Sequence, residues 1–450
     1  MVLPALERFD LEADRLPNRW YNVIPDLPRA PEDFVDPATS RPVDSAYIDR
    51  RLVPALAAQD RSMERWVSIP PEVLAQYRVW RPTPLYRAHA LESELDTPAR
   101  IYFKFEGGSP SGSHKLNSAL AQAHYAKRAG IKRLITDTGA GQWGSALAIA
   151  GALTGLEVVV YMIRSSYERK PDRRNLMETM GAKVLPSPSE HTAVGRQILA
   201  ADPGTPGSEG IAASEALEAV LANPDSRFSM GAFANHVLLH QSVIGLETRA
   251  VLEDLGEEPD HLIASVGCGS NLGGFAFPWV ADRRAGADIK ILAAEPDACP
   301  TLSRGEYRYD YADATGQGPL VRTMTLGHEF VPPAIHAGGL RYHGAAPLVG
   351  MLSHEGLIDA VAYRQREVFA AGAMFARLTG LVPAPETAHA IRAVIDVALR
   401  CKSERRASTI VFCYSGHGLL DLGAYERWNH GLLEDVEDLD QLAAETKVTS

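Results

Sequence analysis

A lysine at the predicted start of a helix is the residue of this sequence that points most clearly to chemistry. Lys115 and its neighbour His114 follow a loop of small residues, 107 to 113, and precede a segment, 116 to 128, whose apolar residues recur at helical spacing. A helix N-terminus disfavours positive charge, so it favours the neutral amine that attacks an aldehyde. We therefore expect Lys115 to hold an aldehyde cofactor as a Schiff base. For an isolated lysine, a solvated helix face would be the simpler interpretation, but three further motifs favour the chemical one.

A run of small residues follows the next predicted strand. Asp137 ends that strand and is followed by the run Thr138, Gly139, Ala140, Gly141, Gln142 and Trp143. A helical pattern over 141–154 begins within this run. Backbone N–H groups exposed at such a turn suit an anion, for example a substrate carboxylate. Asp137 could transfer a proton if burial raises its pKa, although capping the following helix is the simpler role.

A second glycine-rich turn follows a predicted strand at 261–266 and again opens a helix. Its backbone amides, with the side-chain donors of Ser270 and Asn271, suit a compact phosphate monoester. The residues expected to bind this phosphate are Gly267, Cys268, Gly269, Ser270 and Asn271. The alternative is a dinucleotide-binding oxidoreductase with Glu295 as the ribose-binding acid, but Leu272 occupies the position of the third glycine.

The last motif runs from Tyr414 to Gly418 at the end of a predicted strand and contains Ser415. A hydroxyl at this place could bind the ring nitrogen of a pyridine cofactor. Because a neutral serine does not keep that nitrogen protonated, the ring withdraws electrons less strongly, and loss of a β-substituent is favoured over transamination. Together the four motifs describe a site for a phosphorylated pyridine aldehyde.

Strand-like and helix-like segments alternate along the chain that positions these motifs. The predicted strands lie at 101–106, 134–137, 157–162, 183–185, 261–266, 289–294 and 409–412. This alternation predicts α/β architecture, with two three-layer domains whose mostly parallel sheets are covered by helices. Residues 186–212 are rich in Pro, Gly and Ser and are expected to form a loop, and residues 296–350 a long irregular stretch.

Composition excludes several other classes of protein. The 450 residues carry a formal net charge of −11 and no basic stretch, which argues against a nucleic-acid partner. No apolar run is long enough to cross a membrane and the residues from Met1 onward do not have the charged-then-apolar pattern of a leader, so we expect a cytoplasmic protein. The four cysteines show no close pairing and the histidines lack the spacing of a zinc site, so we expect reduced thiols and no metal centre of this kind.

The motifs, in this order, resemble a known family. The sequence is similar to the tryptophan synthase β chains of the longer second type, within the fold-type-II pyridoxal-phosphate enzymes, from residues 4–35 and 81–85 through to the serine turn. Residues 113–117 and 138–144 carry the resemblance most specifically. Trp143, where the commoner type has histidine, indicates the second type.

The resemblance implies a role for each site residue. Lys115 would form the Schiff base with pyridoxal phosphate and move protons at the substrate Cα and Cβ, and His114 would lie near the cofactor phosphate. Ser415 would meet the pyridine nitrogen, and Glu386 would lie close to the ring. The phosphate and substrate carboxylate would bind the two turns already described. The family often also holds a monovalent cation, K⁺ or Na⁺, on backbone carbonyls.

The resemblance also divides the chain into parts. Residues 1–80 would be an N-terminal extension packed on the core, 81–113 part of the C-terminal domain, 114–240 the N-terminal α/β domain with a mobile communication segment at 132–232, 241–430 the C-terminal α/β domain, and 431–450 a tail. A homodimer and a partner α chain are implied in the same way.

The implied reaction is β-replacement, in which L-serine or O-phospho-L-serine reacts with indole to give L-tryptophan. Asp137 departs from the family, which has a glutamate here that assists loss of the hydroxyl and handles the indole proton. Shortening this side chain withdraws the carboxylate by over ~1 Å, which can cost about 10²-fold in rate. The alternatives are β-elimination, replacement with another nucleophile, or a non-catalytic scaffold subunit. The intact Lys115 and Ser415 argue against the last of these, a subunit without catalytic activity.

Overall fold

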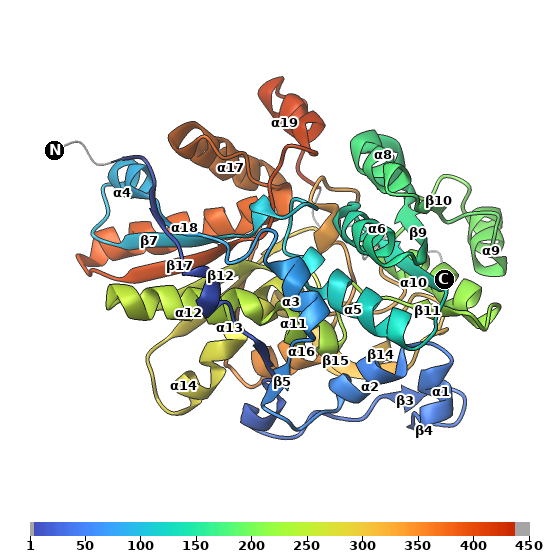
Figure 1. Cartoon of the computed structure of the whole chain (residues 1–450). Coiled ribbons are helices and arrows are strands. Elements are labelled where there is room, and N and C mark those ends of the chain that lie inside the picture. Colours follow the sequence, from blue (N-terminus) through green and yellow to red (C-terminus); the bar gives the residue numbers. More distant parts are fainter. Residues whose placement is uncertain (1–3, 437–450) are drawn as a thin grey trace.

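Two sheets of mostly parallel strands, each covered by helices, build the protein (Figure 1). The computed structural model describes residues 4–436. The larger sheet has the order β1-β6-β7-β17-β12-β13-β16, with its last five strands parallel, and the smaller sheet, β10-β9-β8-β11, is parallel throughout. The bounds are β1 Glu7–Phe9, β6 Leu85–Arg87, β7 Arg100–Phe105, β17 Thr409–Tyr414, β12 His261–Ser265, β13 Lys290–Pro296, β16 Asp359–Tyr363, β10 Lys183–Ser187, β9 Glu157–Ile163, β8 Arg133–Thr138 and β11 Ser226–Phe228.

Both faces of each sheet are buried, which gives each domain its three layers. In β12, Leu262 and Ala264 face the core of the first hydrophobic cluster, whereas Ile263 packs in a second cluster with the helix that includes Ile391. Successive side chains of a strand point to opposite faces, so buried strands become continuous apolar runs. The expected α/β fold with mostly parallel sheets is therefore confirmed.

The helices alternate with the strands along the chain. Their bounds are α1 Ser45–Asp49, α2 Pro54–Asp60, α3 Pro71–Tyr77, α4 His89–Leu95, α5 Leu116–Arg128, α6 Gln142–Thr154, α7 Arg164–Arg169, α8 Pro171–Thr179, α9 Ala193–Ala201, α10 Glu209–Leu221, α11 Asn235–Gln241, α12 Val243–Leu255, α13 Ser270–Ala276, α14 Val280–Arg284, α15 Thr301–Arg304, α16 Pro347–His354, α17 Gln365–Thr379, α18 Pro385–Glu404 and α19 Leu422–Asn429. Helices α4, α17 and α18 lie together at one side of the larger sheet, and α6, α8 and α10 pack around the smaller one (Figure 1).

The prediction that residues 186–212 form a loop is wrong. Helix α9 lies within it, and α10 begins before its end. The side chain of Thr192 accepts a hydrogen bond from the backbone N–H of Gly195, and Ser208 accepts one from that of Ile211. These Ser and Thr residues therefore cap helices, a role that composition alone does not distinguish from a loop.

The prediction that residues 296–350 are irregular is also wrong. It contains an antiparallel pair, β14 Glu306–Tyr311 and β15 Leu320–Thr325, and ends in α16. Strand β14 exposes charged residues on one side, so it lacks the apolar run that signals a buried strand.

The N-terminal residues pack against the two sheets. Trp20 is fully buried, and its ring centroid lies 4.4 Å from that of His240. Strand β2, Arg19–Tyr21, pairs with β5, Trp66–Ser68, and the short strands β3, Val35–Asp36, and β4, Arg41–Pro42, lie near α1 and α2 at the lower edge of the view (Figure 1). Residues between 34 and 52 line one side of a cavity described below.

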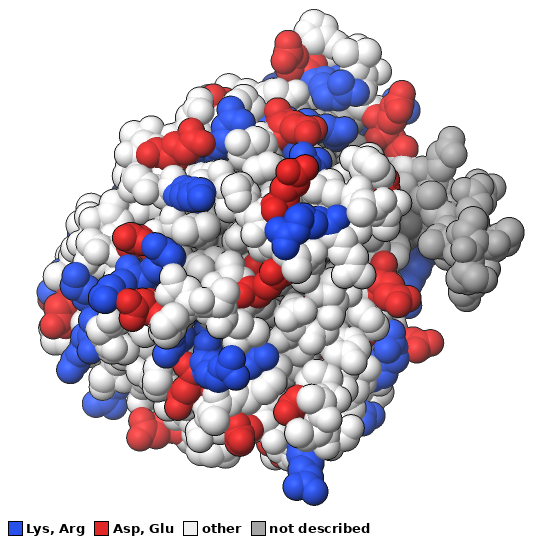
Figure 2. Space-filling model, turned by 90° about the vertical axis from the view of Figure 1, so that its right-hand side faces the viewer, with Lys and Arg blue, Asp and Glu red and all other residues white. Residues whose placement is uncertain are grey.

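Basic and acidic side chains are mixed over the face that Figure 2 shows, without a continuous basic track. Within residues 4–436, no helix has the length and apolar character needed to cross a membrane. All four cysteines are buried and none forms a disulfide.

Candidate active site

The lysine loop joins the end of β7 to the start of α5. Lys115 itself occupies the N-cap position, in a helical conformation and without a side-chain capping bond. The hydroxyl of Ser109 donates to the carbonyl of Ser113 and accepts from its N–H, which closes the loop before the helix begins. The Ser113 hydroxyl does not cap the helix and is buried without a hydrogen-bond partner.

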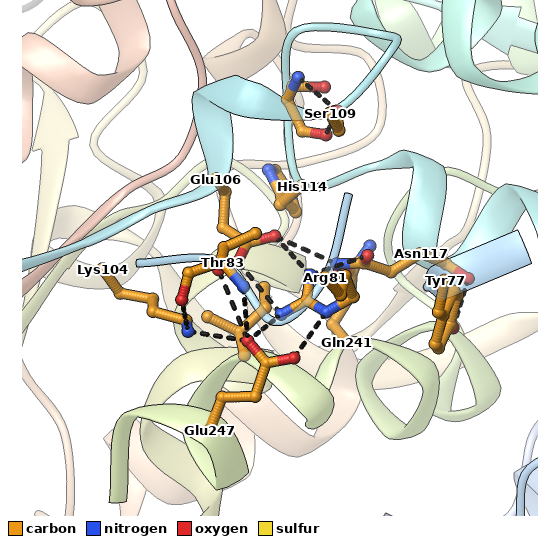
Figure 3. A network of polar contacts seen from close by, with 12 residues as sticks. Tyr77, Arg81, Thr83, Lys104, Glu106, Ser109, His114, Asn117, Gln241 and Glu247 are labelled. Atoms are coloured by element: carbon orange, nitrogen blue, oxygen red, sulfur yellow. Dashed lines mark hydrogen bonds and ion pairs between the residues drawn. The ribbon is translucent and has the colours of Figure 1, made fainter. Parts of the chain in front are cut away.

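A buried ion network supports this loop from below (Figure 3). The Arg81 guanidinium donates to both Glu106 and Glu247, and Lys104 donates to Glu247 at 2.7 Å. These four side chains have no solvent exposure. Burial alone would raise the pKa of Glu106, but the facing Arg81 charge holds it at about 2. The Asn117 amide also bonds Glu106, so the network ties the first turn of α5 to β7.

Lys115 faces a cavity with an empty volume of about 640 Å³. Its Nζ donates to the carbonyl of Gly231 at 3.1 Å. The cavity brings together the predicted cofactor and substrate residues, apart from Gly141, which does not line it. Those that line it are His114, Lys115, Thr138, Gly139, Ala140, Gln142, Trp143, Gly267, Cys268, Gly269, Ser270, Asn271, Glu386 and Ser415. Asp137 lines a neighbouring cavity instead.

His114 is neutral in this setting, because burial lowers its pKa to about 3. Its Nδ1 lies 3.2 Å from the carbonyl oxygen of Ser415, and its Nε2 lies 3.3 Å from the hydroxyl of Ser270. A carbonyl only accepts, so Nδ1 carries the proton and Nε2 accepts from Ser270. His114 therefore links the lysine loop to both the serine turn and the expected phosphate turn.

The expected phosphate turn is shaped by its glycines. Gly269 has φ +109°, a conformation that side chains disfavour, and lies directly before α13. A Cβ on Gly267 would lie 2.7 Å from the carbonyl oxygen of Gly339, across the cavity wall. The backbone of this turn can approach a ligand because these side chains are absent.

We expect Gly267→Ala to weaken binding of pyridoxal phosphate to the apoprotein by about 5- to 100-fold, because relieving the overlap with Gly339 costs about 1–3 kcal/mol. An absorbance titration with the cofactor measures this. Gly423→Ala is the matched control, since nothing lies within 4 Å of a Cβ there. An unchanged dissociation constant for Gly267→Ala would contradict the assignment of this turn.

The opposite wall holds Ser415 and Glu386. The Ser415 hydroxyl lies 2.8 Å from that of Thr387. Glu386, in the first turn of α18, accepts from the Gln142 amide at 2.9 Å and from the Gly339 N–H at 3.0 Å. The carboxylate therefore holds the start of α6 against the loop at 339.

Trp143 separates this cavity from a larger, mostly apolar one with an empty volume of about 930 Å³. Its ring is buried and its Nε1 donates to the Thr136 hydroxyl at 2.7 Å. The two cavities share four lining residues, Trp143, Glu209, Ala232 and Cys268. The apolar lining comes from distant parts of the chain, including Phe34, Ile48, Leu52, Ala213, Leu217, Phe228 and Phe233.

Two carboxyl groups lie where the cavities meet. Burial raises the pKa of Asp137 to about 7, as expected if it transfers protons. Burial and the nearby Asp137 charge raise the pKa of Glu209 to about 8. Sequence reasoning missed Glu209, although its place after Ser208 is a helix-start signal.

The residues present fit pyridoxal phosphate. The Ser113 hydroxyl and the Asn271 Oδ1 are buried beside the cavity without partners, so the site has polar capacity that the chain does not satisfy. The dinucleotide alternative fits poorly, because Glu295 is fully buried and accepts from the N–H groups of Leu302 and Ser303. It thus holds the start of α15 and is not available to a ribose. Among residues 4–436, no group of three or more potential ligands could hold a metal ion.

Known proteins are similar to this chain over most of its length. The family described as pyridoxal-phosphate dependent enzyme matches residues 77–416. The chain is 52% identical over 428 residues to tryptophan synthase beta chain 2 of Pyrococcus abyssi, covering 95% of this chain and 97% of the other. For the protein of the same name from Thermotoga maritima the identity is 52% over 416 residues, covering 92% and 99%.

A solved structure, a fungal L-serine ammonia-lyase from Rhizomucor miehei, aligns with a TM-score of 0.59 at 15% identity over 78% of this chain and 98% of the other. This likeness supports the fold alone. The family match and the sequence identities extend from the lysine loop to the serine turn. The chain therefore belongs to the pyridoxal-phosphate-dependent enzymes and, among them, to the tryptophan synthase beta chains, as a lyase whose cofactor is pyridoxal phosphate.

Proposed function

We propose that the protein catalyses β-replacement, joining L-serine and indole to form L-tryptophan and water. The observation that carries this proposal is the junction of two cavities: one is lined by Lys115 and polar turns, the other by apolar side chains. The apolar cavity has the size of a small-molecule site and suits an aromatic nucleophile. It adjoins the first cavity at Trp143 and Glu209, which line both.

Bound pyridoxal phosphate supplies an electron-withdrawing ring to the substrate Cα. Lys115 holds the cofactor and then carries the proton removed from Cα. The backbone amides of residues 138–143, at the start of α6, hold the substrate carboxylate, because the first N–H groups of a helix lack intrahelical partners. Ser415 can accept from Thr387 and donate to the ring nitrogen.

The two carboxyl groups favour serine over O-phospho-L-serine as the donor. A leaving hydroxyl needs the proton that such groups carry, whereas a phosphate can depart without one. Steady-state assays with each donor and indole, with tryptophan and pyruvate measured separately, test this. A higher kcat/KM with O-phospho-L-serine would contradict the choice of donor. Pyruvate as the main product would instead favour the alternative, β-elimination.

The apolar cavity can be tested by filling it. We expect Ala213→Phe to lower tryptophan formation by at least about 10-fold while serine is still consumed, because Ala213 lines only the apolar cavity. Ala219→Phe, on a less buried position of the same helix, is the control for overpacking α10. Equal loss of both readouts in Ala213→Phe would argue against a separate nucleophile cavity.

Family membership also supports proposals about assembly. We infer a homodimer, a partner α chain and a monovalent cation, K⁺ or Na⁺, for this chain. Sedimentation of the protein alone and with a tryptophan synthase α chain, and assays with either cation against a large organic cation, would test each part separately.

A further inference from the structure

We propose that Glu209 is a second catalytic carboxyl, which protonates the departing serine hydroxyl and later accepts the proton from indole. The inference rests on the proposed function and deepens it. It also answers the difficulty raised by the short side chain of Asp137, since Glu209 supplies a second carboxyl close enough to Asp137 for their charges to interact.

The position of Glu209 carries the inference. Its side chain lines both cavities, whereas Asp137 lines only the apolar one. The Glu209 Oε2 lies 3.4 Å from the place that a Cβ on Gly139 would occupy, beside the turn expected to hold the substrate carboxylate. Glu209 therefore lies beside the part of the cavity that would hold the β-carbon, because the β-carbon of an amino acid is close to its carboxylate.

The Glu209 carboxyl is available for chemistry. Its Oε2 is buried and has no hydrogen-bond partner in the chain. A buried polar atom of this kind costs free energy unless a ligand satisfies it. The residue itself is held in place, because α10 begins here and Ser208 caps the helix. The backbone is therefore fixed while the carboxyl remains free to bond a substrate.

Charged and titratable groups face Glu209 from several elements. Asp137, on β8, and Glu386, on α18, favour its protonated form, while Lys115 and Arg341 favour the ionised form. The buried Cys268 thiol and Tyr342 hydroxyl also lie nearby and are neutral, since burial raises the pKa of each. Burial outweighs the cations, so the carboxyl is protonated near neutral pH.

The chemical step balances as follows. Lys115 takes the proton from Cα, and the electron pair of that bond forms a double bond to Cβ as the C–O bond breaks. Glu209 donates its proton to the leaving oxygen, which departs as water. C3 of indole then forms a bond to Cβ, Lys115 returns its proton to Cα, and the Glu209 carboxylate removes the proton from C3, which restores the carboxyl. No oxidant or reductant is needed.

The decisive experiment compares Glu209→Gln with the parent holoenzyme, using total serine consumption as the readout. We expect kcat to fall about 10²-fold, with a smaller change in KM, because general acid catalysis contributes about 10²–10⁴-fold. With β-chloro-L-alanine, whose chloride leaves without a proton, the loss should shrink to less than about 10-fold. Glu218→Gln on the same helix is the control, since its carboxylate bonds the start of α9 and not the cavity.

Two further readouts exclude a structural role. Parent activity should fall as pH rises through about 8, because the acid form is lost, and Glu209→Gln should lack that limb. In the apoprotein, the infrared band of a protonated carboxyl that titrates in this range should be missing from Glu209→Gln. Adding Asp137→Glu to the Glu209→Gln protein should restore at least about 10-fold in serine consumption.

The inference is overturned if the rate at which Glu209→Gln consumes serine is within about threefold of the parental rate. It is also overturned if the variant's rates with serine and with β-chloro-L-alanine fall by the same factor, or if the variant no longer binds the cofactor. A parent that consumes no serine would overturn it as well. A parent that consumes serine without forming tryptophan refutes the proposed function alone, because serine consumption still judges Glu209.

Discussion

Replacing Lys115 with alanine is expected to lower tryptophan formation by at least about 10³-fold, the largest effect of any single change. Lys115 is the amine at the cavity that can hold the cofactor, and the same group carries the Cα proton, so one substitution removes two functions. Product formation under saturating cofactor measures the loss. Borohydride reduction of the parent, followed by peptide mapping, should place the reduced cofactor on Lys115.

Lys127→Ala is the matched control, because this lysine is exposed in the last turn of the same helix. It should retain parental activity and cofactor labelling. Labelling of a different lysine in the parent, or substantial tryptophan formation by Lys115→Ala, would contradict the assignment.

The second large effect is on stability. We expect Glu247→Gln to lower the free energy of unfolding by about 3–5 kcal/mol, because it removes one carboxylate from a fully buried network and leaves Arg81 and Lys104 with only Glu106 as a countercharge. Chemical denaturation of the apoprotein measures this change. Cofactor affinity should fall too, since the network holds the first turn of α5 (Figure 3).

Asp225→Asn supplies the comparison for an exposed ion pair. Asp225 pairs with Lys132 at 2.9 Å, but these side chains are 58% and 73% exposed. Such pairs contribute about 0–1 kcal/mol. A loss for Glu247→Gln no greater than that for Asp225→Asn would show that the buried network does not stabilise the fold.

The sequence predicts the site residues best where they lie in a turn or loop that begins at the end of a strand. Ser415 and the glycine turn at 267–271 follow strands directly, and the loop that carries Lys115 begins where β7 ends. Parallel strands bring such ends to one edge of a sheet. Local signals therefore suffice for the helix at 116–128, which the structure shows with those bounds. They do not reveal the hydrogen bonds of Ser109 that close the loop before this helix, because those bonds depend on the folded backbone.

The parts that could not be predicted depend on contacts between distant residues. Glu209 lies in a stretch whose Pro, Gly and Ser content suggests a loop, and only the fold brings it to Asp137. The apolar cavity likewise combines Phe34 and Ile48 with α10 and the loop at 233. No periodicity in the sequence connects these segments, so the second cavity appears only in the structure.

The most direct test of the account is a product analysis with isotopically labelled substrates. The purified protein, supplied with pyridoxal phosphate, is incubated with ¹³C-labelled L-serine and ¹⁵N-labelled indole, and the products are identified by mass spectrometry. The account predicts tryptophan that carries both labels, with little labelled pyruvate. Labelled pyruvate with unchanged indole would contradict it, because the apolar cavity would then not deliver the nucleophile to the β-carbon.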